Sequence, residues 1–333
     1  MRNRNLQNRV TTGRFTLPVV TLFCITCWLL TGFILSPLPK EPNTYLLCQW
    51  LNGAALSQWA TLSISFMLYA IIGYFLIEIN NTFGIIRMRA SVQTSLFLLL
   101  IAACPALHRF YAGNIAALSL LISLYFLFKS YQSSTSASRL FHSFVFMSIG
   151  SIAFPQLTLL APIWLIGAYS FQALTLRSIC AALLGWSLPY WFLFAHAYFY
   201  GQMELFYAPF IELATVGPIQ LSENLQPWEL ATLIYLFIQF VVSAVHAFAS
   251  GYQDKIRTRS YLNFLIFVCF SLFLFILLQP IHSHSFLSLL LPLVSVLMGH
   301  LYVLTNNRLA NAFFISSTAG LILLFIFNIW MLL

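Results

Sequence analysis

Acidic residues gather in one long break between hydrophobic segments of this chain. The segment 201–227 holds Glu204, Glu212 and Glu223, and Glu229 follows it directly. The chain has only seven acidic residues in 333, so more than half of them lie in this region. A carboxylate held near a hydroxyl group can act as a general base. Glu204 and Glu212 are therefore candidate catalytic bases.

A second group of residues could hold a phosphate next to these carboxylates. Arginine and histidine bind phosphate through charge-assisted hydrogen bonds. The candidates fall in segments that we expect on the same side of the molecule as the acidic loop; they are Arg109, His108, His282, His284 and His196. Glu41, in an earlier loop, is the third candidate base. Because loops that meet water are polar in any case, the sequence leaves open whether these residues form a site.

Two other motifs carry little chemistry. His282 and His284 share one turn, but no cysteine or carboxylate close in sequence completes a tetrahedral metal site. Cys24 and Cys27 have the spacing of a redox pair, yet they lie inside an apolar segment where thiolates are disfavoured. We therefore expect no metal centre and no cofactor.

The composition identifies the elements that must position these residues. The chain is 61% hydrophobic and 7% charged, with a mean hydropathy of +0.89, whereas soluble domains carry about 25% charged residues. Its apolar runs are continuous over roughly 20 residues, the length of a membrane-spanning helix, and do not alternate as barrel strands do. The net charge of +8 is spread over loops. No basic domain is present to bind nucleic acid.

The sequence therefore predicts an all-α, polytopic transmembrane bundle of about eleven spans in a single membrane domain, residues 1–333. A tail covers 1–14, and the outer loops 37–58 and 201–227 each contain a helix lying in the interface. A break at 154–156 divides one long uncharged stretch into two spans. The expected spans are 15–35, 59–79, 90–107, 112–128, two within 140–176, 178–200, 227–250, 260–279, 285–305 and 312–333.

Charge then predicts the orientation. With these spans, all but two of the 15 lysines and arginines fall on one side; the exceptions are Lys40 and Arg109. Cytoplasmic loops are rich in these residues, so we expect a cytoplasmic N-terminus and a periplasmic C-terminus in a bacterial inner membrane. The carboxylates and the phosphate-binding candidates then share the outer face. Pro227 and Glu229 suit the first turn of the span that begins there.

Two stretches resemble known membrane protein families. The layout of a span, an outer loop with an interfacial helix and then short hairpins, together with AGNIAALSLLISLYFLFKSY at 112–131, resembles the GT-C superfamily of polyprenyl-phosphate-sugar glycosyltransferases. The stretch at 155–192, PQLTLLAPIWLIGAYSFQALTLRSICAALLGWSLPYWF, is similar to an uncharacterised family of polytopic membrane proteins from Bacteroidetes. GT-C enzymes usually carry acidic catalytic residues in the first outer loop, where this chain offers only Glu41.

The resemblance implies a protein of cell-envelope biogenesis that handles a lipid-linked sugar or phosphate at the outer leaflet. If it is an enzyme, it is a polyprenyl-phosphate-sugar-dependent glycosyltransferase, and its partners are membrane lipid and that lipid-linked sugar. Two alternatives stay open: a non-catalytic assembly or scaffold subunit, and a secondary transporter. The sequence names no protein partner.

Overall fold

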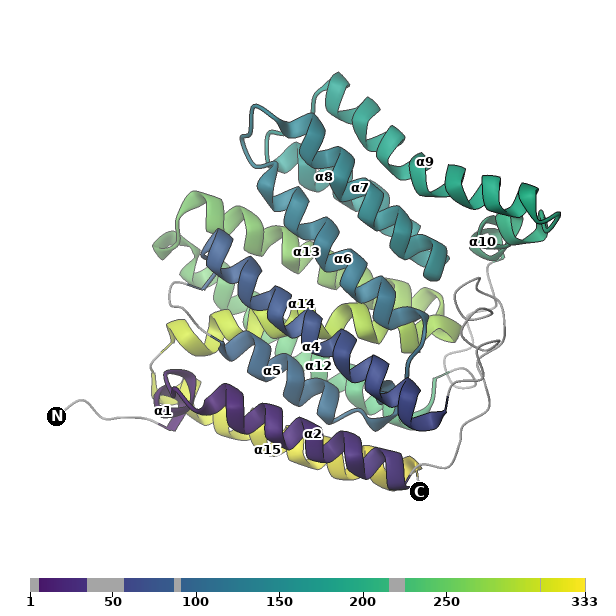
Figure 1. Cartoon of the computed structure of the whole chain (residues 1–333). Coiled ribbons are helices and arrows are strands. Elements are labelled where there is room, and N and C mark those ends of the chain that lie inside the picture. The colour runs from purple at the N-terminus through teal and green to yellow at the C-terminus, as the bar shows by residue number, and fades with distance from the viewer. Residues whose placement is uncertain (1–5, 35–56, 87–90, 216–224, 306, 333) are drawn as a thin grey trace. The chain divides into compact units, whose positions relative to one another are not determined.

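The computed structural model describes residues 6–34, 57–86, 91–215, 225–305 and 307–332. Within these ranges every regular element is a helix (Figure 1), which confirms the predicted helical class. The candidate base Glu41 and the interfacial helix expected within 37–58 lie outside the described residues. Glu223 does so as well.

Among the described residues, eight helices are long and apolar enough to cross a membrane. Each coincides with one of the expected spans, and together they indicate a multi-pass membrane protein. These helices are α2 (Thr16–Ile34), α4 (Gln58–Phe83), α6 (Ala112–Lys129), α9 (Leu176–Phe199), α12 (Pro227–Ser250), α13 (Ile256–Leu278), α14 (Ser283–Leu304) and α15 (Arg308–Leu332).

Two of the three other expected spans are built from shorter pieces, and the third, with 18 residues, is less apolar than the membrane-length helices. One is α5 (Val92–Ala102) followed by the 3-10 helix η1 (Pro105–His108). At 1.5 Å per residue, the 11 residues of α5 cover about half of a ~30 Å hydrocarbon layer. The other two are α7 (Ser136–Ala153), and η2 (Pro155–Leu160) with α8 (Ala161–Ser170). Pro155 ends α7, as the sequence predicts, while a total of about eleven crossings stays a prediction.

The chain divides into two compact units, which we describe separately. Unit 1 contains 58–110 and 220–333 together with the N-terminal 38 residues, and unit 2 contains 39–57 and 111–219. The expectation of a single membrane domain stays a prediction.

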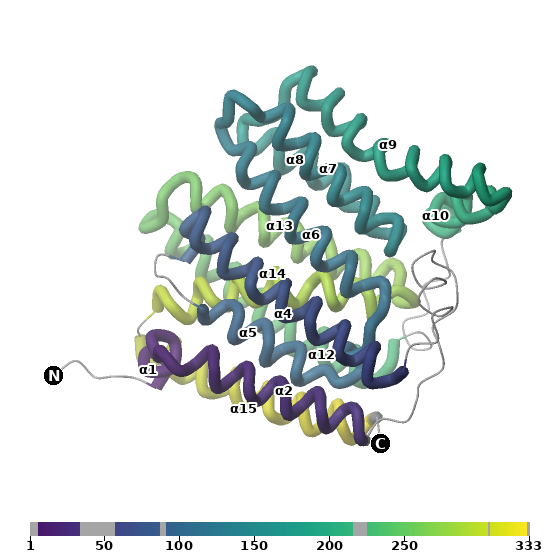
Figure 2. The backbone as a smooth tube through the Cα atoms, in the orientation of Figure 1, coloured from purple at the N-terminus to yellow at the C-terminus, as the bar shows by residue number. Residues whose placement is uncertain are grey.

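Unit 1 is built around α14. Within the membrane-length part of α14, 89% of the residues are buried inside the protein. Leucine and valine side chains occupy all faces of this helix, so it can be surrounded by other helices. It packs against α5, α12 and α13 (Figure 2). The short α1 (Leu6–Thr11) contacts α14 and α15. On the outside of this unit α2 and α15 lie side by side (Figure 1), with the Phe23 and Phe325 rings 6.2 Å apart.

Hydrogen bonds between helices hold unit 1 at two levels. At one level the Asn328 amide of α15 donates to the carbonyl of Ala103, just after α5. At the other, the Tyr302 hydroxyl of α14 donates to Gln239 of α12 at 3.0 Å. Gln239 accepts and Asn328 donates in these contacts between separate helical segments. Such bonds stabilise helix pairs where lipid supplies no hydrophobic force between them.

Unit 2 packs through small residues. Ser123 of α6 and Ser143 of α7 lie 3.0 Å apart between their hydroxyls. A side chain at Gly185 of α9 would collide with the backbone carbonyl of Phe141 on α7, so only glycine permits this approach. The turn after α6 meets the turn after α8, where Gln132 donates to Gln172 at 3.1 Å. Both turns therefore lie at the same end of unit 2.

Candidate functional site

Glu229 lies in the first turn of helix α12 (Pro227–Ser250) and is almost completely buried. Pro227 is the first residue of that helix, where its missing N–H costs nothing. The Glu229 carboxylate accepts a hydrogen bond from the backbone N–H of Gln226 at 3.1 Å, and the two residues form a capping box. Only 4% of Glu229 is exposed. The structure thus confirms that Pro227 and Glu229 occupy the first turn of this span.

His284 completes an acid–base pair with this carboxylate. It lies in the first turn of α14, with its Nδ1 3.9 Å from Glu229 Oε1. The Trp228 ring meets the histidine ring edge-on at 5.7 Å between centroids, and the Ser283 side chain hydrogen-bonds to Glu229. The side chain of His284 is 29% exposed. Glu229 is therefore enclosed, whereas the His284 imidazole is partly accessible.

A buried polar layer supports the pair from below. Thr232, one turn after Glu229, accepts a hydrogen bond from the Asn328 amide at 3.3 Å. Its hydroxyl lies 3.7 Å from the sulfur of Cys104. These contacts join α12, α15 and the segment after α5, so three parts of the chain fix the helix that carries Glu229.

His108 lies inside the bundle of unit 1. Its ring stacks on Trp28 at 3.6 Å between centroids and is fully buried. Nε2 lies 3.1 Å from the carbonyl of Ile101, and Nδ1 lies 2.8 Å from the Thr31 hydroxyl. Because a carbonyl can only accept, the neutral ring carries its proton on Nε2. Both nitrogens are used within the fold, so His108 holds η1 in place.

Arg109 follows directly and is half-buried. Its burial lowers the pKa of the guanidinium, which still stays charged at neutral pH. The preceding η1 is tied to α14, because the Tyr69 hydroxyl lies 3.2 Å from the carbonyl of Leu107 and 3.4 Å from Ser288. Ser288 is one turn after His284 on α14. Arg109 therefore lies at the same end of unit 1 as the Glu229–His284 pair.

The remaining candidates in unit 2 surround helix α10 (Glu204–Ala214). Glu204 is its exposed first residue, and Glu212 accepts a hydrogen bond from Gln156 at 3.2 Å. His196 is exposed near the end of α9. Within each unit the predicted residues share one region, and the structure brings His284 to a carboxylate. His282 lies in the turn before α14 and is half-buried.

The sequence places Glu229 among the acidic residues near the outer loop but does not mark it as a site residue. The signal was present, because a proline two residues before a glutamate at the start of a span predicts a helix cap. What it could not predict was the partner, since His284 is distant in sequence. Among the described residues no group of three or more His, Cys, Asp or Glu side chains could hold a metal ion.

Comparison with protein-family models, with curated proteins and with solved structures finds no match for this chain. Only the geometry of the described residues bears on the function of this chain.

Proposed function

We propose that this protein is an inner-membrane component of cell-envelope biogenesis that handles a lipid-linked sugar or phosphate at the outer leaflet. The observation that carries the proposal is the Glu229–His284 pair, a nearly buried carboxylate 3.9 Å from a partly exposed imidazole. A carboxylate this buried at the end of a helix bundle is costly to ionise, and such groups often mark functional sites. The cation Arg109 lies at the same end of unit 1.

The three side chains suit three roles. Arg109 would bind the phosphate of the lipid carrier, since a guanidinium pairs with phosphate oxygens at two points. His284 faces outward and would accept the proton of an incoming hydroxyl group. Glu229 would orient the imidazole and stabilise its protonated form. A separation of 3.9 Å is longer than a hydrogen bond, but catalytic pairs often shorten only when substrate binds. This chemistry corresponds to a polyprenyl-phosphate-sugar-dependent glycosyltransferase.

The first experiment measures binding to the protein in nanodiscs. A short-chain polyprenyl phosphate serves as the probe. We expect Arg109→Gln to weaken its affinity about tenfold or more, because a hydrogen bond to a charged group contributes about 1.5–3 kcal/mol. Arg308→Gln, an exposed arginine at the opposite end of unit 1, is the matched control and should bind as the wild type does. Equal affinity of all three proteins would rule out the phosphate role of Arg109.

A second measurement separates an enzyme from a binding protein. With a polyprenyl-phosphate-linked sugar and water as the acceptor hydroxyl, we expect the wild type to transfer the sugar to water and release polyprenyl phosphate. His284→Gln should slow that release at least 100-fold, the loss expected for a general base, while changing the affinity less than twofold. Binding without any release would instead support the non-catalytic assembly subunit, the alternative that the sequence leaves open.

A further inference from the structure

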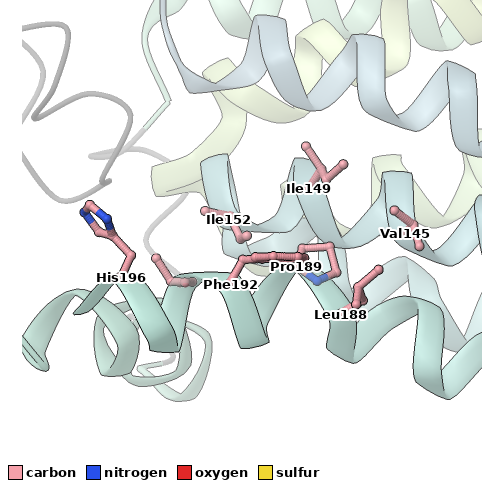
Figure 3. A pocket seen from close by; sticks show the side chains of 8 residues that line it. Val145, Ile149, Ile152, Leu188, Pro189, Phe192 and His196 are labelled. Carbon is pink, nitrogen blue, oxygen red and sulfur yellow. The ribbon is translucent and has the colours of Figure 1, made fainter. Parts of the chain in front are cut away.

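Unit 2 contains a groove between α7 and α9 that has no role in the proposed function. Its volume is about 430 Å³. Figure 3 shows its lining residues, which come from both helices, with His196 at one end of the row. Val145, Ile149 and Ile152 line it from α7. Leu188, Phe192 and their neighbours line it from α9, and His196 is the single polar side chain among the lining residues.

The sequence of α9 explains why the groove opens. At Gly185 helices α7 and α9 are in close contact, because a Cβ atom at this position would clash with the backbone carbonyl of Phe141. One turn later Pro189 lies inside α9, where it removes a backbone hydrogen bond and bends the helix. The lining residues of α9 start at Leu188 and continue beyond this proline. The groove is therefore a consequence of a tight contact followed by a bend.

The position of α9 shows what kind of molecule can fill the groove. This helix is one of the membrane-length helices of the described residues, and only 33% of its spanning window is buried inside the protein. Phe192 at the groove is 70% exposed. In a bilayer such surface meets hydrocarbon chains rather than water. A groove with aliphatic walls then favours a flexible alkyl chain.

The charges at the His196 end select the headgroup. Helix α10 packs there, with its Phe206 and Phe210 rings 5.3 Å and 5.1 Å from Phe194 and Tyr190 of α9. Glu212 of this helix meets Gln156, one turn beyond the lining residue Ile152. From 178 to 215 the sequence contains two glutamates and no lysine or arginine. A headgroup at this end therefore meets negative charge, which favours an ammonium group and disfavours a net anion.

We infer that the groove between α7 and α9 binds one acyl chain of phosphatidylethanolamine, with the lipid's ammonium group next to the Glu212 carboxylate. The His196 ring lies where it can donate to the phosphate of the same lipid. This lipid would be a bound structural partner of unit 2. The inference does not depend on the proposed function, whose residues lie in unit 1.

Native mass spectrometry of the protein tests this inference. The protein is released from nanodiscs that contain equal amounts of phosphatidylethanolamine and phosphatidylglycerol, with no polyprenyl phosphate present. We expect one retained phosphatidylethanolamine, at least fivefold more abundant than retained phosphatidylglycerol. Ile149→Trp, which fills the groove, should reduce retention at least fivefold. Leu183→Trp, at a position on α9 that is 63% exposed and outside the groove, should not change it.

A further variant tests whether the Glu212 carboxylate selects the headgroup. Glu212→Gln should keep a bound lipid but lose the preference for phosphatidylethanolamine over phosphatidylglycerol. A phosphatidylethanolamine with a photoreactive acyl chain should crosslink to 145–152 or 188–196, which locates the lipid even if a filled variant folds poorly. Absence of retained lipid in the wild type, equal retention by Ile149→Trp, or a preference for phosphatidylglycerol would each overturn the inference.

Discussion

At the scale of single residues, His108 shows how position changes the meaning of a polar side chain. The sequence places it next to Arg109 in a short turn, which suggests a phosphate ligand. In the structure its ring is stacked on Trp28 and hydrogen-bonded at both nitrogens. Sequence patterns could not show this, because a turn between helices looks the same whether it faces water or folds back into the bundle.

The burial of His108 leads to a pH-dependent stability. Desolvation lowers the pKa of this ring from 6.5 to about 3, so the folded protein keeps it neutral. The unfolded chain takes up a proton below pH 6.5, and stability is therefore full above that pH and is lost as the pH falls toward 3. At pH 5 the loss from this residue is about 2 kcal/mol.

Thermal unfolding in nanodiscs between pH 7.5 and 5 measures this effect. We expect the melting temperature of the wild type to fall with pH, and the fall to be smaller in His108→Phe, which keeps a ring against Trp28 but cannot titrate. The difference between the two slopes is the contribution of His108. Identical slopes would show that this histidine does not stay neutral in the folded state.

Glu229 illustrates what sequence can predict about a site residue. A glutamate two positions after a proline at the start of an apolar run predicts a capped helix, and the structure has that cap. The neighbouring histidine comes from a helix more than fifty residues later. Only the packing of α12 against α14 brings the two together, so the pair could not be predicted from local patterns.

At the scale of elements, the proline break at 155 was predictable because it interrupts an uncharged stretch that is too long for one span. The lengths of the individual helices could not be predicted in the same way. Helix α5 ends after 11 residues, since η1 folds back into unit 1 through His108 and the carbonyl of Leu107. Apolar sequence alone does not distinguish such a buried short helix from a full span.

Gly185 provides a prediction about how α7 and α9 pack. We expect Gly185→Ala to destabilise the protein by about 1–3 kcal/mol, because the added methyl group collides with the backbone of Phe141 and the helices must separate. Gly320→Ala is the matched control. Its added carbon would lie 3.3 Å from a carbon of the Tyr235 ring, a wider separation than at Gly185 and from a side chain rather than backbone.

Melting temperatures of the two variants in the same nanodiscs give the comparison. We expect a clear decrease for Gly185→Ala and a small change for Gly320→Ala. Equal melting temperatures would mean that the tight contact between α7 and α9 contributes little to the stability of unit 2.

At the scale of the whole molecule, the distribution of charge predicts how the membrane-length helices are oriented. In unit 1 the described basic residues other than Arg109 lie around α1 and at one end of α13 and α15; they are Arg9, Arg14, Lys255, Arg257, Arg259 and Arg308. The Glu229–His284 pair lies at the opposite end. We therefore expect the pair to face the periplasm, since the basic ends of membrane helices stay in the cytoplasm.

Cysteine accessibility in intact cells tests this arrangement most directly. Leu309→Cys and Ile281→Cys are made separately, with Cys48 and Cys180 replaced by serine; these positions are 84% and 63% exposed and lie at opposite ends of unit 1. We predict that a membrane-impermeant maleimide labels Ile281→Cys in intact cells and labels Leu309→Cys only after the membrane is opened. Labelling of both from the same side would contradict the proposed orientation and the outward-facing site with it.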